Sequence, residues 1–198
     1  MNFKHYDILS QLVMGYVLLV VIVNFFKIEY NTSYSVVYLA FAFVIGYFIN
    51  TISSLLESIF YCLIGGKPSN KLLQIKEGKK YTGCFKVRFY ETEETIKLLK
   101  KDVSDENADT EKLFYKAMML VNSNEKSRIF DFNGHYAFSR NVLTTMLLTT
   151  ILLLIKYCCH CETYLIFIPL LLSYVRYGQR AYYYAREVLN EYLVLKNK

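Results

Sequence analysis

Charged residues are scarce in this chain, and tryptophan is missing altogether. Only 20% of the 198 residues are charged and 54% are hydrophobic, whereas soluble domains average about 25% charged and about 45–50% apolar residues. The sequence also has no glycine-rich phosphate loop, nucleophile elbow or metalloprotease helix motif. The composition therefore disfavours a single water-soluble core, and the missing motifs give an enzyme little support.

The apolar residues are concentrated in two blocks, one in each half of the chain. A transmembrane helix needs about 20 mainly apolar residues to cross about 30 Å of hydrocarbon. Four stretches fit, at about 8–26, 36–56, 138–156 and 164–177. The last is short and contains Pro169, which a spanning helix tolerates when its neighbours re-satisfy the freed carbonyl. No cleavage pattern follows the first stretch, so we expect it to be retained.

We predict an all-α membrane protein with four transmembrane helices and a cytosolic helical bundle. The expected organisation is an N-terminal transmembrane hairpin (1–64), a cytosolic helical segment (65–137), a C-terminal transmembrane hairpin (138–177) and a cytosolic C-terminal helix (178–198). Most basic residues near the span ends lie on one side, and the positive-inside rule makes that side the cytosol. Both termini of this multi-pass protein of the cell inner membrane are then cytosolic. These residues are Lys4, Lys67, Lys71, Lys76, Arg128, Arg140, Arg176, Arg180 and Arg186.

The central polar segment contains signals for two short helices. Thr92 followed by two glutamates is typical of a helix N-cap, and Asp109 begins a second start signal. Each start is followed by apolar residues at helical spacing, so the two helices must bury those faces against something else. Between 85 and 90, apolar and polar residues alternate over too short a run to separate a strand from a helix. Longer helices are expected at 125–155 and through 176–195.

The most suggestive constellation is Arg128, Asp131, His135 and Ser139, whose spacings place all four on one helical face. One interpretation is an Arg-x6-His pair of the HEPN ribonuclease type, in which Arg128 holds an RNA phosphate and His135 exchanges a proton. The alternative is an ordinary Arg128–Asp131 pair beside polar residues at the entrance to the bilayer. Arg128 and His135 are catalytic candidates only under the first interpretation.

Soft metal ligands are clustered in Cys158, Cys159, His160 and Cys161. Four adjacent residues cannot all reach one tetrahedral ion, so a labile disulfide and a plain loop are the alternatives. Five cysteines in such a chain do not indicate a disulfide framework. We therefore expect neither a metal nor a cofactor.

Two further patterns have both a structural and a functional interpretation. Tyrosines and arginines alternate from 174 to 186, which suits either a helix leaving the cytosolic leaflet or the stacking of a nucleic-acid strand. Threonines form a polar strip on the third span, which suits either helix association or a wet pore. The strip consists of Thr144, Thr145, Thr149 and Thr150.

The stretch FNGHYAFSRN at 132–141, the Arg128/His135 spacing and the two hairpins around a helical insert together resemble the multi-pass accessory proteins of type VI-B CRISPR loci. This resemblance implies a non-enzymatic membrane accessory or effector of antiviral defence. Such a protein regulates a cytosolic RNA-guided nuclease or permeabilises the membrane as a homo-oligomer, so its partners are the lipid bilayer, further copies of the chain and a nuclease. A membrane-tethered HEPN-like ribonuclease acting on RNA and a simple ion channel remain the alternatives.

Overall fold

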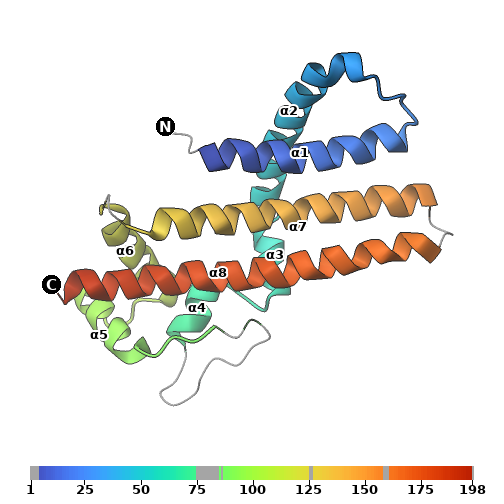
Figure 1. Ribbon diagram of the computed structural model, residues 1–198. Helices are drawn as coiled ribbons and strands as arrows, with labels where there is room; N and C mark the ends of the chain where they lie inside the picture. The colour runs from blue at the N-terminus through green and yellow to red at the C-terminus, as the bar shows by residue number, and fades with distance from the viewer. Residues whose placement is uncertain (1–4, 75–84, 86, 125–126, 158–160, 198) are drawn as a thin grey trace. The chain divides into compact units, whose positions relative to one another are not determined.

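The computed structural model describes residues 5–74, 85, 87–124, 127–157 and 161–197, and every regular element in these ranges is helical (Figure 1). This confirms the all-α prediction for that part of the chain. The elements are α1 (His5–Phe25), the short 3-10 helix η1 (Thr32–Tyr34), α2 (Ser35–Leu55), α3 (Glu57–Leu63), α4 (Pro68–Leu73), α5 (Thr92–Val103), α6 (Thr110–Asn122), α7 (Ile129–Tyr157), the 3-10 helix η2 (Cys161–Ile166) and α8 (Phe167–Lys196).

In the part of the chain that the structure describes, three helical stretches are long and apolar enough to cross a membrane. They are Ile8–Phe25, Thr32–Leu55 and Ile129–Tyr157. They overlap the first three predicted spans, although the third begins before the predicted residue 138. α8 is not among them, because Arg176 and Arg180 follow closely on its apolar beginning. Pro169 lies in the first turn of α8, where backbone N–H groups have no acceptor within the helix, so it does not interrupt the helix.

The chain divides into two compact units. Unit 1 comprises Met1–Glu57 and Ala137–Tyr177, and unit 2 comprises Ser58–Tyr136 and Gly178–Lys198. The two long helices expected from the sequence are present as α7 and α8, and each contributes residues to both units.

Small residues allow α1 and α2 of unit 1 to cross in close contact (Figure 1). A Cβ atom on Gly15 would overlap the carbonyl oxygen of Ala42, and one on Gly46 would overlap the backbone of Gln11. Ala42 and Gly46 have the small-xxx-small spacing that lets transmembrane helices approach each other closely. Around this crossing, Met14, Leu18 and Ile49 form a buried apolar cluster, against which apolar side chains of α7 pack.

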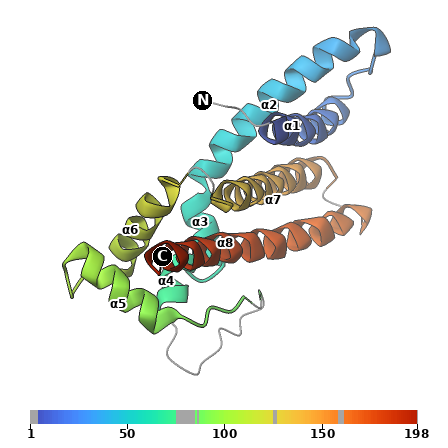
Figure 2. The same ribbon diagram turned by 60° about the vertical axis from the view of Figure 1, so that its left-hand side comes forward.

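In unit 2, α4, α5 and α6 pack against one another and lie beside the C-terminal part of α8 (Figure 2). α6 begins as predicted, since the Asp109 side chain accepts a hydrogen bond from the Lys112 amide at 2.7 Å. α5 begins one residue earlier than expected: Thr92 is already helical and Glu91 occupies the N-cap position. The apolar faces of both helices are buried, as their spacing predicted, with Leu99, Leu113, Ala117 and Val121 in the core.

In the alternating segment before α5, the described residues belong to neither a strand nor a helix. Phe85, Val87 and Phe89 are buried. The Phe85 ring occupies the space that a side chain at Gly178 would fill, and it stacks on Tyr182 with ring centroids 5.6 Å apart. The period of two therefore reflects packing against α8.

A charged contact joins α5 to the end of α8 in the same unit. Asp102 accepts a hydrogen bond from the Tyr192 hydroxyl at 2.8 Å and pairs with Lys196 at 2.8 Å. Burial alone would raise the pKa of the Asp102 carboxyl, but the hydrogen bonds from Lys196 and Tyr192 outweigh it and hold that pKa below its usual value. Burial and the bond to Asp102 raise the pKa of Tyr192. This contact ties the last turns of the chain to its central segment.

Candidate functional site

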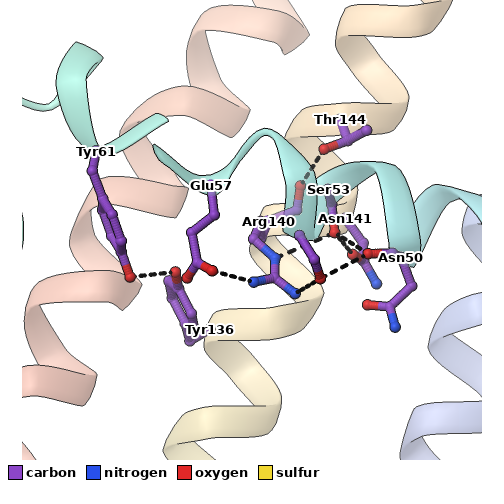
Figure 3. Close-up of polar contacts among 9 residues, drawn as sticks. Asn50, Ser53, Glu57, Tyr61, Tyr136, Arg140, Asn141 and Thr144 are labelled. Carbon is purple, nitrogen blue, oxygen red and sulfur yellow. Dashed lines mark hydrogen bonds and ion pairs between the residues drawn. The ribbon is translucent and has the colours of Figure 1, made fainter. Parts of the chain in front are cut away.

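A charged cluster lies within unit 1, between the end of α2, the start of α3 and the middle of α7 (Figure 3). Arg140 Nη1 lies 3.1 Å from Glu57 Oε2. Its Nη2 donates to Ser54 Oγ at 2.9 Å, and its Nε donates to Ser53 Oγ at 3.2 Å. Each nitrogen of the guanidinium group therefore has an acceptor. We call Arg140, Glu57, Ser53, Ser54 and Asn141 the Arg140 cluster.

Asn141 extends the cluster into the interior of the unit. The Ser53 hydroxyl lies 2.6 Å from Asn141 Oδ1 and 2.8 Å from the carbonyl oxygen of Asn50, and both are acceptors for its single hydrogen. Ser53 and Asn141 are both buried. The same hydroxyl thus accepts from Arg140 and donates further into the interior, so the bonds polarise one another.

The positions of these side chains follow from the ends of the helices that carry them. Ser53 and Glu57 are four residues apart, which in a helical segment directs both toward the same side. The Ser53 and Ser54 hydroxyls also bond to the Asn50 carbonyl, a back-bond that tends to bend a helix. α2 ends at Leu55 and α3 begins at Glu57, so the cluster lies at an interruption between two helices.

A buried ion pair is unusual in a helix as apolar as α7. The Arg140 side chain is only 11% exposed and that of Glu57 29%, and α7 otherwise qualifies as a membrane-crossing helix. A buried ion is costly unless it is paired and hydrogen-bonded. Ionisable residues inside membrane helices are rare and usually have a function. The Arg140 cluster is accordingly the strongest candidate site in the described part of unit 1.

The predicted threonine strip lies beside this cluster and is buried. Thr144 and Thr145 donate to the carbonyls of Arg140 and Asn141, and Thr150 donates to that of Met146. The Thr149 hydroxyl is buried without a hydrogen-bond partner among the described residues. Since three of the four hydroxyls bond to their own helix, the arrangement suits helix packing better than a water-lined pore.

The predicted Arg128/His135 pair belongs to unit 2 and is exposed. Arg128 lies in the turn just before α7, where its carbonyl accepts from the Asp131 amide at 3.1 Å. His135 lies within α7 and is exposed, as is Asp131, whereas Ser139 is buried and lies in unit 1. The four residues therefore do not share one exposed surface, although both catalytic candidates are accessible to solvent.

The tyrosine-rich part of α8 in unit 2 belongs largely to the core. Tyr182 is buried against Phe85. Tyr184 stacks on Tyr136 with centroids 5.7 Å apart, and the Tyr136 hydroxyl lies 2.8 Å from that of Tyr61 (Figure 3). These rings are committed to packing, which leaves them unavailable for stacking on nucleic acid.

The soft-ligand cluster at 158–160 lies outside the described residues, and of Cys161 only the backbone is described. Among the residues that the structure describes, no group of three or more histidine, cysteine or acidic side chains is placed to hold a metal ion.

Sequence analysis did not connect the two charges of the Arg140 cluster. Arg140 was interpreted as a marker of orientation, and the second span was predicted to end at about residue 56, next to Glu57. The available signal was that the two opposite charges fall within or next to predicted spans, where each needs a partner. Ser53 and Asn141 gave no signal of their own.

Comparison with protein-family models, curated proteins and solved structures finds no match for this chain. Its described residues define an all-helical fold with three helices able to cross a membrane, and a charged cluster joins α7 to the junction of α2 and α3.

Proposed function

We propose that this protein is a non-enzymatic effector of antiviral defence in the cell inner membrane, which permeabilises that membrane as a homo-oligomer. The Arg140 cluster holds the membrane unit in its resting state, and rupture of the cluster opens it. The cluster is the observation that carries the proposal, because a buried, fully bonded Arg140 in a helix that is able to cross a membrane is costly to retain without a function. The defence context rests on the resemblance to type VI-B accessory proteins.

The proposal includes four spans, with both termini and unit 2 in the cytosol. Support comes from unit 2, where Asp102 in α5 bonds to Tyr192 and Lys196 in α8. Residues in such contact lie on one side of a bilayer. If α7 crosses the membrane after Asp102, the chain must cross back before Tyr192. The apolar start of α8 supplies that crossing, and Arg176 reaches headgroups by snorkelling.

Orientation in the proposal follows the positive-inside rule. The connection between α1 and α2 has one lysine and one glutamate, Lys27 and Glu29, whereas unit 2 is rich in lysine and arginine. Unit 2 then forms a cytosolic helical bundle, in a position to receive a signal from a cytosolic partner such as an RNA-guided nuclease.

Permeability of cells that express single variants tests this function. We expect Arg140→Leu and Glu57→Leu to cause potassium efflux and dye entry at expression levels where the wild type causes neither. Thr51→Ala is a matched control, because this exposed hydroxyl bonds to the Tyr47 carbonyl of its own helix and to no other described residue. The exchange of both charges, Glu57→Arg with Arg140→Glu, should restore the closed state in part.

Membrane-inserted Arg140→Leu and Glu57→Leu proteins that leave cells impermeant would overturn the permeabilising function.

The proposed role in antiviral defence is tested separately, by the genes that neighbour this one. A ribonuclease effector encoded beside this protein supports a defence role, and its consistent absence argues against that role.

A HEPN-like ribonuclease is the second candidate, favoured by the exposure of Arg128 and His135. The HEPN mechanism requires that an arginine and a histidine from two protomers converge on one phosphate. Cleavage of RNA by the purified protein, abolished by His135→Ala without loss of folding, would establish this function in place of the non-enzymatic one.

A further inference from the structure

A groove in unit 1 lies between the C-terminal half of α1, the α1–α2 connection and the start of α2. Its volume is about 550 Å³. The groove follows from the glycine contact, because helices that cross at Gly15 and Gly46 diverge beyond the crossing point (Figure 1). One wall is apolar and consists of Leu19, Val20 and Val23 of α1.

The other end of the groove is polar and aromatic. Tyr30 stacks on Tyr38 with ring centroids 4.7 Å apart, and a hydrogen bond with Tyr16 raises the pKa of Tyr30. Lys27 and Glu29 also line the groove, and both are exposed. Neither has an ion-pair partner among the described residues. A lysine and a glutamate without partners therefore border one apolar groove.

The backbone at Lys27 gives a second reason to single out this residue. Its amide bonds to the Asn24 carbonyl and the Ile28 amide bonds to the Val23 carbonyl, which is the Schellman arrangement that ends a helix. Lys27 occupies the left-handed position of that arrangement at φ 55°, where glycine is favoured. A strained non-glycine residue at a ligand-sized groove is a basis for proposing a function.

A lysine of α7 that contacts Asn24, a residue lining the groove, is already engaged. Lys156 of α7 donates to the Asn24 carbonyl and lies 3.2 Å from Asn24 Oδ1. Its ammonium also lies 5.0 Å from the centroid of the Tyr157 ring. Among the described residues that line the groove, Lys27 is thus the cation available to a ligand.

We infer that this groove binds a zwitterionic phospholipid with an ammonium headgroup, of the phosphatidylethanolamine type. Lys27 holds the phosphate, Glu29 and the tyrosine rings hold the ammonium, and the apolar wall of α1 holds an acyl chain. Phosphatidylglycerol fits less well, because it carries the same phosphate charge but no ammonium to pair with Glu29. Tyr30, just after α1, and Tyr38, near the start of α2, are also typical of the headgroup region.

Lipid retention by the purified full chain tests the inference. The wild type and variants are reconstituted in nanodiscs containing equal amounts of phosphatidylethanolamine and phosphatidylglycerol, released gently, and analysed by native mass spectrometry. We expect one phosphatidylethanolamine to remain bound to the wild type. Lys27→Gly should reduce that occupancy about tenfold, since a charge-assisted contact is lost.

Lys27→Gly separates binding from folding, because glycine suits the left-handed backbone and the melting temperature should not fall. Glu29→Gln should lower the preference for phosphatidylethanolamine over phosphatidylglycerol. The double variant Lys67→Gln/Glu111→Gln removes an exposed ion pair of unit 2 and should retain lipid like the wild type. Equal retention of both lipids by the wild type, or unchanged retention by Lys27→Gly, would overturn the inference.

Discussion

The glycines of this protein differ in how closely other atoms approach them. Gly46 packs on the backbone of Gln11, which cannot move aside easily, whereas nothing lies within 4 Å of a Cβ at Gly134. We expect Gly46→Val to lower the free energy of unfolding by about 1–3 kcal/mol through overpacking. Gly134→Ala should leave it unchanged or raise it by up to about 1 kcal/mol. Thermal unfolding in detergent measures both, and equal effects would contradict the close crossing of α1 and α2.

The Asp102 contact makes part of the stability depend on pH. Because the pKa of Asp102 is lowered on folding, its contribution is complete above the unfolded value of about 3.9 and is lost as the pH falls through the folded value. We therefore expect Asp102→Asn to lower the melting temperature at pH 7, and the difference from the wild type to shrink below about pH 4. Circular dichroism melts across pH measure this. A difference that is constant with pH would mean that the charge of Asp102 contributes nothing.

Features of single residues could be predicted from the sequence where they depend only on the nearby backbone. Asp109 caps α6 as its sequence context predicted. Thr92 does not cap α5, and its hydroxyl is buried without a partner among the described residues. The partner of Arg140 could not be predicted, since Glu57 is distant in the sequence and the contact depends on how α7 packs.

At the scale of elements, the Arg140 cluster links α7 to the junction of α2 and α3. Breaking a buried pair by removing one partner typically costs about 3–5 kcal/mol, whereas removing both costs less because no charge is stranded. We expect Arg140→Met and Glu57→Met each to destabilise the purified protein, and the double variant to be more stable than the sum of the two effects implies. Unfolding measurements on the three variants form a double-mutant cycle. Additive effects would mean that the two charges do not interact.

Helices were the most predictable elements, because apolar periodicity and length determine them directly. α1, α2 and α7 end close to the predicted span limits, and α5 and α6 appear where their apolar faces predicted them. The segment at 85–90 was not predictable. Its alternation arises from burial against α8 through Phe85 and Gly178, which is a contact between residues far apart in the sequence.

At the scale of the whole molecule, length and composition identify three helices in the described part of the chain that are able to cross a membrane. The proposed fourth crossing rests on contacts, because the Asp102–Tyr192 bond joins α5 to the end of α8 within one unit. No pattern in the sequence pairs these two residues. The division into a unit with the candidate spans and a unit rich in lysine and arginine is therefore the basis for the proposed topology.

Accessibility of single cysteines tests this topology most directly. In a background without native cysteines, Ser33→Cys, Asn107→Cys and Asn197→Cys place thiols at exposed positions in the α1–α2 connection, the α5–α6 connection and the C-terminus. An impermeant maleimide should label only Ser33→Cys in intact spheroplasts, and all three after permeabilisation. Labelling of Asn197→Cys in intact spheroplasts would remove the fourth span. Labelling of Asn107→Cys but not Ser33→Cys would reverse the orientation and contradict the account.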